Sequence, residues 1–295
     1  MDWSFFVEVL VGGLLAGVMY SLVALGFVLI YKASGVFNFA QGAMVFAAAL
    51  VFARLREKGV GLLPAALLTL ALLVAFAFGV EKLVLRPLVN QPPIALFMAT
   101  IGLAFLIEGI AQGVLGAQVH SLDIGVSDVP IQVRGIAISK FDLFSAGVAA
   151  ILVAALALFF SRTRTGRALR AVADDHQAAL AVGIPLQRIW AIVWSVAGFV
   201  ALVAGVLWGC RIGVQFSLTF LALKALPVLI LGGFESIPGA IVGGLIVGAS
   251  EKLAEVYLGP RIGSGLENWF PYVLAVVFLL VRPEGLFGER RIERV

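Results

Sequence analysis

Long apolar segments follow one another along almost the whole sequence. They lie near residues 5–31, 38–53, 60–80, 94–116, 142–160, 189–209, 219–233, 238–256 and 266–282. A helix that crosses the hydrocarbon core of a bilayer needs about 20 mostly apolar residues, and its backbone groups must be hydrogen-bonded within the segment. We therefore expect an all-α integral membrane protein, a polytopic bundle of about eight transmembrane helices plus broken or half-helices, forming one transmembrane domain over residues 1–295.

The composition favours the same class. Of the 295 residues, 62% are hydrophobic and 13% are charged, whereas soluble domains are roughly 45–50% apolar and 25% charged. One cysteine, Cys210, and two histidines, His120 and His176, speak against a disulfide framework and a Cys/His metal centre. The net charge of +4 suits loops that contact anionic lipid, and nucleic-acid binding, which needs clustered basic faces, is not expected.

Two of the apolar segments are short for a span. Those that begin near Asn38 and Thr219 contain only about 15 apolar residues each. We expect half-helices or re-entrant pieces there, buried within the protein.

Arginine and lysine in the short connections predict the orientation, because cytoplasmic loops of membrane proteins carry the excess of both. The loop 161–188 and the C-terminus, both rich in arginine, are therefore expected on the cytoplasmic side. Alternation of the spans then makes 117–141 the longest periplasmic loop. The same alternation places Arg54, Arg56 and Lys58 outside, against the rule, so the side of residues 54–58 stays open.

Polar residues interrupt the apolar pattern in both halves of the chain, with Asn38 and Gln41 in one break and Glu235 and Ser236 in the other. Paired interruptions are typical of discontinuous helices around a transport pathway. The alternative is that the nearby glycines only allow close helix packing through small residues. In the second half of the chain, the glycines concerned are Gly239, Gly243, Gly244 and Gly248.

Glu108 and Gln112 lie one helical turn apart within the segment 94–116. An ionisable residue inside a span is costly, so it is a candidate for the pathway. The alternative is a bond to a neighbouring helix, or a side chain that extends to the interface. Other charged residues fall near predicted span ends and are expected at the interface: Glu8, Glu81, Glu251, Lys252 and Glu255.

The loop 161–188 is polar and helix-prone. Asp174 and Asp175 are suited to cap a short helix that Gly183 and Pro185 end. Such a helix, with small alanines on one side, fits a partner's groove, so we expect a docking element. An ordinary solvated loop is the alternative.

Several motifs, in the same order and spacing, resemble a known family. They are Gly26-Phe27-Val28-Leu29-Ile30-Tyr31, Gly35-Val36-Phe37-Asn38-Phe39-Ala40-Gln41-Gly42, Arg86-Pro87-Leu88, the run Arg167 to Asp174, Leu231-Gly232-Gly233 with Ser236 to Ala240, and Arg282 to Gly288. The chain resembles the inner-membrane permeases of ATP-binding-cassette (ABC) transporters for branched-chain amino acids, the Liv-type high-affinity importers.

The resemblance implies a multi-pass protein of the bacterial inner membrane that works with two cytoplasmic ABC ATPases, a second and different permease, and a periplasmic solute-binding protein. The chain has no G-x-x-x-x-G-K-[ST] loop, so it is expected to hold no cofactor, to bind no ATP and not to be an enzyme. Importer permeases also carry Glu-Ala-Ala, three residues, then Gly. Here Gln177, Ala178, Ala179 and Gly183 have that spacing, although Gln replaces Glu and the downstream Leu-Pro is absent. The expected ATPase-coupling residues are Arg167, Arg170, Asp174, Asp175, Gln177, Ala178, Ala179 and Gly183.

These features predict transport of a small amphiphilic solute by alternating access. The expected pathway residues are Asn38, Gln41, Glu108, Gln112, Glu235 and Ser236. A stand-alone secondary transporter or channel is the alternative, but a coupled carrier usually places several ionisable residues at mid-membrane. An intramembrane enzyme needs a nucleophile with a base or a metal, and no such motif is found. The solute and the identity of the second permease stay open.

Overall fold

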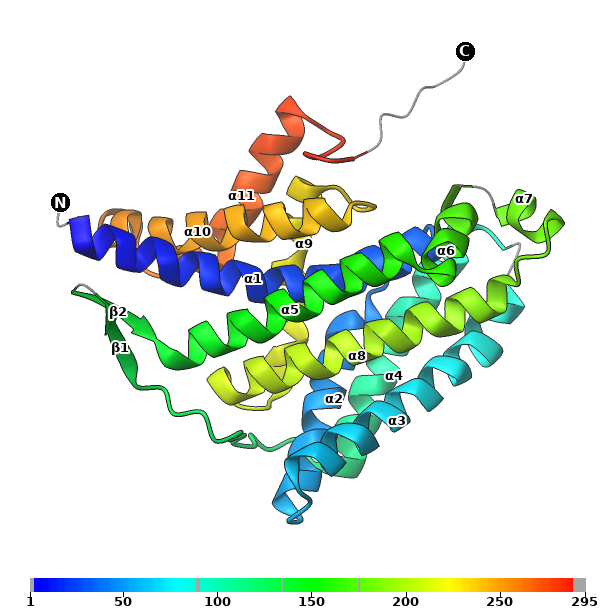
Figure 1. Ribbon diagram of the computed structural model, residues 1–295, viewed down its shortest axis with the longest axis horizontal. Helices are drawn as coiled ribbons and strands as arrows, with labels where there is room; N and C mark the ends of the chain where they lie inside the picture. Colours follow the sequence, from blue (N-terminus) through cyan, green and yellow to red (C-terminus); the bar gives the residue numbers. More distant parts are fainter. Residues whose placement is uncertain (1–2, 89–90, 134, 175, 289–295) are drawn as a thin grey trace. The chain divides into compact units, whose positions relative to one another are not determined.

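The computed structural model describes residues 3–88, 91–133, 135–174 and 176–288, which are mostly helical (Figure 1). Six helical segments in this part of the chain are long and apolar enough to cross a membrane: α1 (Trp3–Ser34), α3 with its continuation (Leu62–Leu88), α4 (Pro93–Leu115), α5 (Lys140–Arg162), α8 (Leu186–Ile212) and α10 (Ile237–Ile262). Two apolar helices are shorter, Phe216–Gly232 and α11 (Leu266–Val281). The expected all-α polytopic class is confirmed.

The remaining elements are short or lie between the long helices. They are α2 (Ala40–Glu57), the π-helix η1 (Glu81–Leu85) and the 3-10 helix η2 (Arg86–Leu88) that continue α3 (Leu62–Val80), the strands β1 (Pro130–Val133) and β2 (Ile136–Ser139), α6 (Arg164–Asp174), α7 (His176–Ala181), and the 3-10 helix η3 (Phe216–Phe220) that leads into α9 (Leu221–Gly232). The strands form an antiparallel hairpin, with Pro130 opposite Ser139, inside the expected outer loop 117–141.

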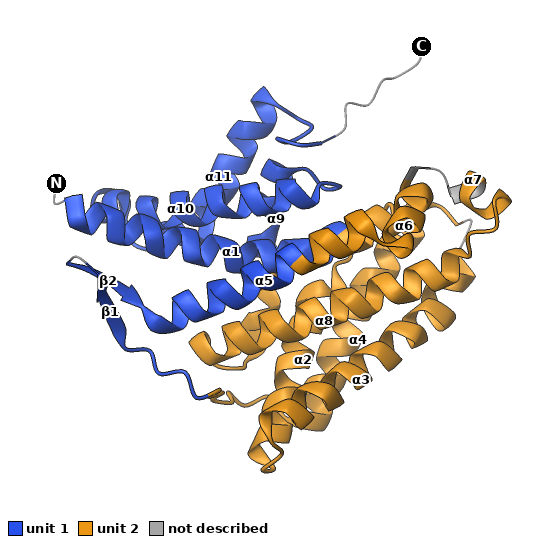
Figure 2. Ribbon diagram, viewed as in Figure 1, with its two compact units in different colours: residues 1–28, 125–154, 223–295 blue, residues 29–124, 155–222 orange. Residues whose placement is uncertain are grey.

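The chain divides into two compact units (Figure 2). Unit 1 contains residues 1–28, 125–154 and 223–295, and unit 2 contains residues 29–124 and 155–222. Each unit is described separately below, so the expected single transmembrane domain over residues 1–295 stays a prediction.

Unit 2 is built around α2, which packs against α3, α4, α8 and η3. A half-helix or re-entrant piece buried within the protein was expected here. The helix is 18 residues long, it is not among the six segments apolar enough to cross a membrane, and most of its side chains are buried. Close packing depends on small residues: a Cβ at Gly205 of α8 would lie 2.5 Å from the carbonyl oxygen of Val45. Small side chains thus allow a helix of modest hydropathy to be enclosed by protein.

The loops of unit 2 lie at opposite ends of its helices. At one end His120 pairs with Val214 in an antiparallel bridge, and its Nδ1 lies 2.6 Å from Oε1 of Glu57 at the end of α2. At the other end the indole of Trp190 donates a hydrogen bond to the carbonyl oxygen of Ala33. Residues 54–58 and the start of the 117–141 loop therefore share one end, as the alternation of spans predicts.

In unit 1, α1 and α10 come into backbone contact. A Cβ at Gly244 would lie 2.6 Å from the carbonyl oxygen of Gly17. A Cβ at Gly248 would collide with the carbonyl oxygen of Gly13. On its other side α10 approaches α9, because a Cβ at Gly243 would lie 2.5 Å from the carbonyl oxygen of Val228. The close packing through small residues, which was the alternative reading of the α10 glycines, is therefore present, and a pathway at this break stays a prediction.

Candidate functional site

The break between α1 and α2 places amide side chains inside the apolar core of unit 2. Gly35 ends α1 with a φ of 69°, a conformation that glycine adopts without strain. Asn38 and Gln41 beyond it are both completely buried. Oδ1 of Asn38 accepts a bond from the backbone of Ala40, and Nε2 of Gln41 donates one to the carbonyl oxygen of Ala197.

Each of these two amides has one atom left without a partner. Nδ2 of Asn38 and Oε1 of Gln41 are buried and have no hydrogen bond among the described residues. An unsatisfied buried polar atom is costly, and ordered water is its usual partner. The break therefore holds one unused donor and one unused acceptor in a membrane-embedded core.

The second break, between α9 and α10, is built differently. Gly233 adopts a φ of 100°, and Oγ of Ser236 caps α10 by accepting a bond from the backbone of Gly239. Glu235 beside it is exposed. Because this break lies in unit 1 and that of Asn38 in unit 2, their place on one pathway stays a prediction.

Glu108 and Gln112 both lie half-buried on α4 of unit 2. Neighbouring apolar side chains on the helix, Phe105, Leu106 and Ile110, are more than half exposed, as expected of a helix that borders lipid. The assignment of Glu108 and Gln112 to a pathway stays a prediction.

A buried ionic network in unit 1 was missed at the sequence level. Nζ of Lys224 in α9 lies 2.9 Å from Oε1 of Glu251 in α10. The same oxygen accepts a hydrogen bond of 3.1 Å from the hydroxyl of Tyr20 in α1, and the ammonium lies 5.8 Å from the centre of the Tyr20 ring. The side chain of Glu251 is 3% exposed and that of Lys224 is 25% exposed. Three helices are thus joined by one carboxylate.

The expectation that Glu251 lies at the interface is therefore wrong. The predicted span ended near residue 256, but α10 continues to Ile262, which moves Glu251 into the helix interior. Glu81 is also buried, and its carboxylate holds Arg86 through bonds of 3.2 and 3.3 Å. Lys224 was the available signal, because an ammonium within an apolar run needs a carboxylate partner.

The expected docking loop folds as two short helices, α6 and α7, in unit 2. Leu169 and Val172 bury one side of α6, whereas Arg167 is exposed and Arg170 donates a bond of 2.7 Å to the carbonyl oxygen of Phe160. The predicted short helix near Asp174 is present as α7, and Gly183 follows it with a φ of 83°.

The predicted coupling residues in this loop differ in exposure. Ala178 is exposed and Ala179 is buried. Asp175 lies outside the described residues, and so do the side chains of Asp174 and Gln177. The apolar side chains that α7 and its C-terminal end expose most are Leu180 and Val182. The coupling role of the loop stays a prediction.

The family described as "Branched-chain amino acid transport system / permease component" matches residues 9–282. The chain belongs to this family. It is 30% identical to the high-affinity branched-chain amino acid transport system permease protein LivH of Salmonella typhimurium. The alignment of 318 positions covers 100% of this chain and 99% of that protein. The corresponding permease BraD of Pseudomonas aeruginosa is also 30% identical, over 98% of both chains.

A more distant relative is the fructose import permease protein FruG of Bifidobacterium longum, 26% identical over 84% of this chain and 74% of that one. Among solved structures, PsaBC from Streptococcus pneumoniae in complex with Fab has a TM-score of 0.49 and 15% identity over 92% of this chain and 89% of that chain. The expected family and the location, a multi-pass protein of the inner membrane, are confirmed.

Proposed function

We propose that the chain is the membrane permease of an ATP-driven importer, and that it moves branched-chain amino acids or a related small amphiphilic solute. The observation that carries the proposal is the family match over residues 9–282, together with full-length similarity to permeases named for branched-chain amino acid transport. The similarity to a fructose permease is the reason for including related solutes.

The energy for transport enters from partner subunits in this proposal. Two cytoplasmic ABC ATPases bind ATP, so the chain itself needs no cofactor and catalyses no reaction. A second, different permease completes the pathway, and a periplasmic binding protein delivers the solute. The ATPases contact α6 and α7, where Arg167 and the C-terminal end of α7 are exposed.

Movement of the solute follows alternating access. Nucleotide binding tips an equilibrium between two arrangements of the helices, which requires that they differ by only a few kcal/mol. The buried Asn38 and Gln41, each with an unused hydrogen-bonding atom, are suited to contact the solute or water on the way. Glu108, Gln112, Glu235 and Ser236 complete the proposed pathway.

The proposal is tested by affinity purification of the chain from mild detergent at native expression. We expect a P-loop ATPase and a second hydrophobic permease to remain bound. Recovery of the chain alone, with solute transport in ATP-free vesicles, would overturn the proposal.

Glu108 offers a test of the pathway assignment. The change Glu108→Gln keeps the side chain's size and removes its charge, so uptake is expected to fall if the carboxylate faces the solute. Expression is measured in parallel. Unchanged uptake at unchanged expression would assign Glu108 a structural role.

A stand-alone carrier is the second candidate, and the Lys224 and Glu251 ion pair is the observation that favours it. Ionisable residues within spans mark the pathways of many coupled carriers. Such a carrier would transport solute with an ion or proton gradient and without ATP, so the dependence of uptake on ATP separates the two candidates.

A further inference from the structure

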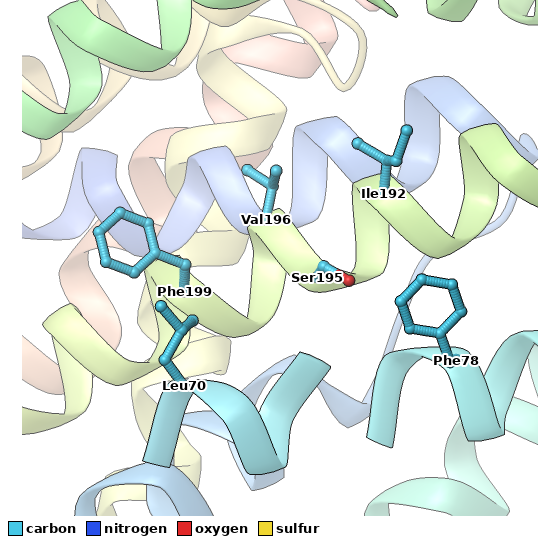
Figure 3. A pocket seen from close by; sticks show the side chains of 6 residues that line it. All are labelled: Leu70, Phe78, Ile192, Ser195, Val196 and Phe199. Atoms are coloured by element: carbon cyan, nitrogen blue, oxygen red, sulfur yellow. The ribbon is translucent and has the colours of Figure 1, made fainter. Parts of the chain in front are cut away.

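An apolar groove of about 360 Å³ runs between α3 and α8 of unit 2 (Figure 3). It is lined by Leu70, Phe78, Ile192, Ser195, Val196 and Phe199. Ser195 is the one lining residue with a side-chain oxygen, and its hydroxyl donates a bond of 2.7 Å to the carbonyl oxygen of Ala191. The groove thus offers hydrocarbon surface and no free polar group, which suits a hydrocarbon chain rather than a polar solute.

The α3 side of this groove belongs to a helix surface that is open within its unit. Leu67, Leu68, Leu72 and Phe78 are all more than half exposed, on a segment long and apolar enough to span a membrane. In the bilayer the solvent for such a surface is lipid hydrocarbon. The molecule available to fill the groove in the bilayer is therefore a lipid acyl chain.

Phe78 and Ile192 lie opposite each other at one end of the groove (Figure 3). One basic residue lies on each of the two helical segments, one turn beyond that end. Arg188 precedes Ile192 by four residues in α8, so it shares the face of α8 that lines the groove. Lys82 follows Phe78 by four residues and belongs to η1, which itself contacts α8. Both side chains are exposed, and neither has an ion-pair partner among the described residues. Arg86 differs, because Glu81 holds it.

We propose that this groove is a binding site for an anionic phospholipid, with an acyl chain along Phe78, Ile192 and Phe199 and the phosphate between Lys82 and Arg188. Basic pockets between transmembrane helices on the cytoplasmic side are suited to anionic head groups. The stretch from Ile192 to Phe199 rises about 10 Å, so the groove holds one part of the chain and leaves the rest in the bilayer. This inference concerns a different site from the proposed transport pathway and does not depend on it.

Competition between lipids tests the proposal. The purified protein is given equal amounts of phosphatidylglycerol and phosphatidylcholine, and the lipids that it retains are counted by native mass spectrometry. We expect phosphatidylglycerol to be preferred, and the double change Lys82→Gln with Arg188→Gln to reduce that preference by about thirtyfold, the effect expected of two basic residues at a membrane surface. The control Lys58→Gln with Lys140→Gln removes the same charge from two other exposed positions and is expected to leave the preference unchanged.

Further variants separate the head group from the chain. Val196→Trp fills the groove and is expected to lower retention of both lipids, whereas the swap Lys82→Arg with Arg188→Lys keeps both charges and is expected to retain the preference. Soluble glycerol phosphate is expected to compete weakly, because it lacks the chain. The proposal is overturned if Lys82→Gln with Arg188→Gln behaves like the charge control, or if folded Val196→Trp protein retains as much phosphatidylglycerol as the unaltered chain. Because the charge variants alter only exposed side chains, they decide the matter even if Val196→Trp fails to fold.

Discussion

The change Lys224→Met tests whether the ion pair in unit 1 stabilises the folded protein. Removal of one partner leaves the carboxylate of Glu251, which is only 3% exposed, without its opposite charge. Breaking a buried pair in this way costs about 3–5 kcal/mol. We expect the lower value, about 3 kcal/mol, because a quarter of Lys224 reaches the surface of the chain. With about 2 °C per kcal/mol for a large chain, the Tm is expected to fall by about 6 °C.

Thermal unfolding of the detergent-purified protein measures this shift, and the chain provides a matched control. Lys252 lies 3.5 Å from Glu267, but both side chains are more than one third exposed. Exposed pairs contribute about 0–1 kcal/mol, so Lys252→Met is expected to change the Tm by 2 °C or less. The double change Lys224→Met with Glu251→Gln is expected to recover most of the loss, because it leaves no unpaired charge. Equal shifts for Lys224→Met and Lys252→Met, or strict additivity in the double variant, would refute the reasoning.

Further tests are available at Gly248, Glu57 and Leu180. Gly248→Ala places a methyl group against the backbone of α1 and is expected to cost about 1–3 kcal/mol in thermal unfolding, whereas Gly12→Ala, with nothing within 4 Å, is expected to cost nothing. The hydrogen bond from His120 lowers the pKa of the Glu57 carboxyl, so its stabilisation is complete above the unfolded-state pKa and is lost as the pH falls through the folded-state pKa. The Tm difference between the unaltered chain and Glu57→Gln should therefore be present at neutral pH and shrink as the pH falls through the lowered pKa of Glu57. A difference that is absent at neutral pH, or that grows as the pH is lowered, would contradict the assignment. Leu180→Asp is expected to reduce co-purified ATPase with unchanged membrane insertion, and undiminished ATPase would argue against docking at α7.

Most of the long helices could be predicted from the sequence because span length depends on a local property, a run of about 20 apolar residues. The apolar runs of α4, α5 and α8 contain few charges, so their positions were predicted closely. The end of α10 was not, because the predicted segment stopped near residue 256, whereas α10 continues to Ile262 with Pro260 inside it. A carboxylate can remain inside a helix when another helix supplies its partner, and that partner is a tertiary feature.

The same limit applies to the candidate site. Asn38 and Gln41 could be recognised because they break an apolar run locally, and the structure buries both. The network of Tyr20, Lys224 and Glu251 joins residues up to 231 positions apart, and no local pattern connects them. Only Lys224 could have indicated the network from the sequence, because an ammonium group in an apolar segment needs a partner of opposite charge.

The measurement that tests the transport account most directly is uptake of labelled leucine into proteoliposomes that contain the complex purified through this chain. The account predicts uptake that requires ATP on the side of the ATPases and a solute-binding protein on the other side. Uptake that proceeds without ATP and responds instead to an imposed ion gradient would contradict it.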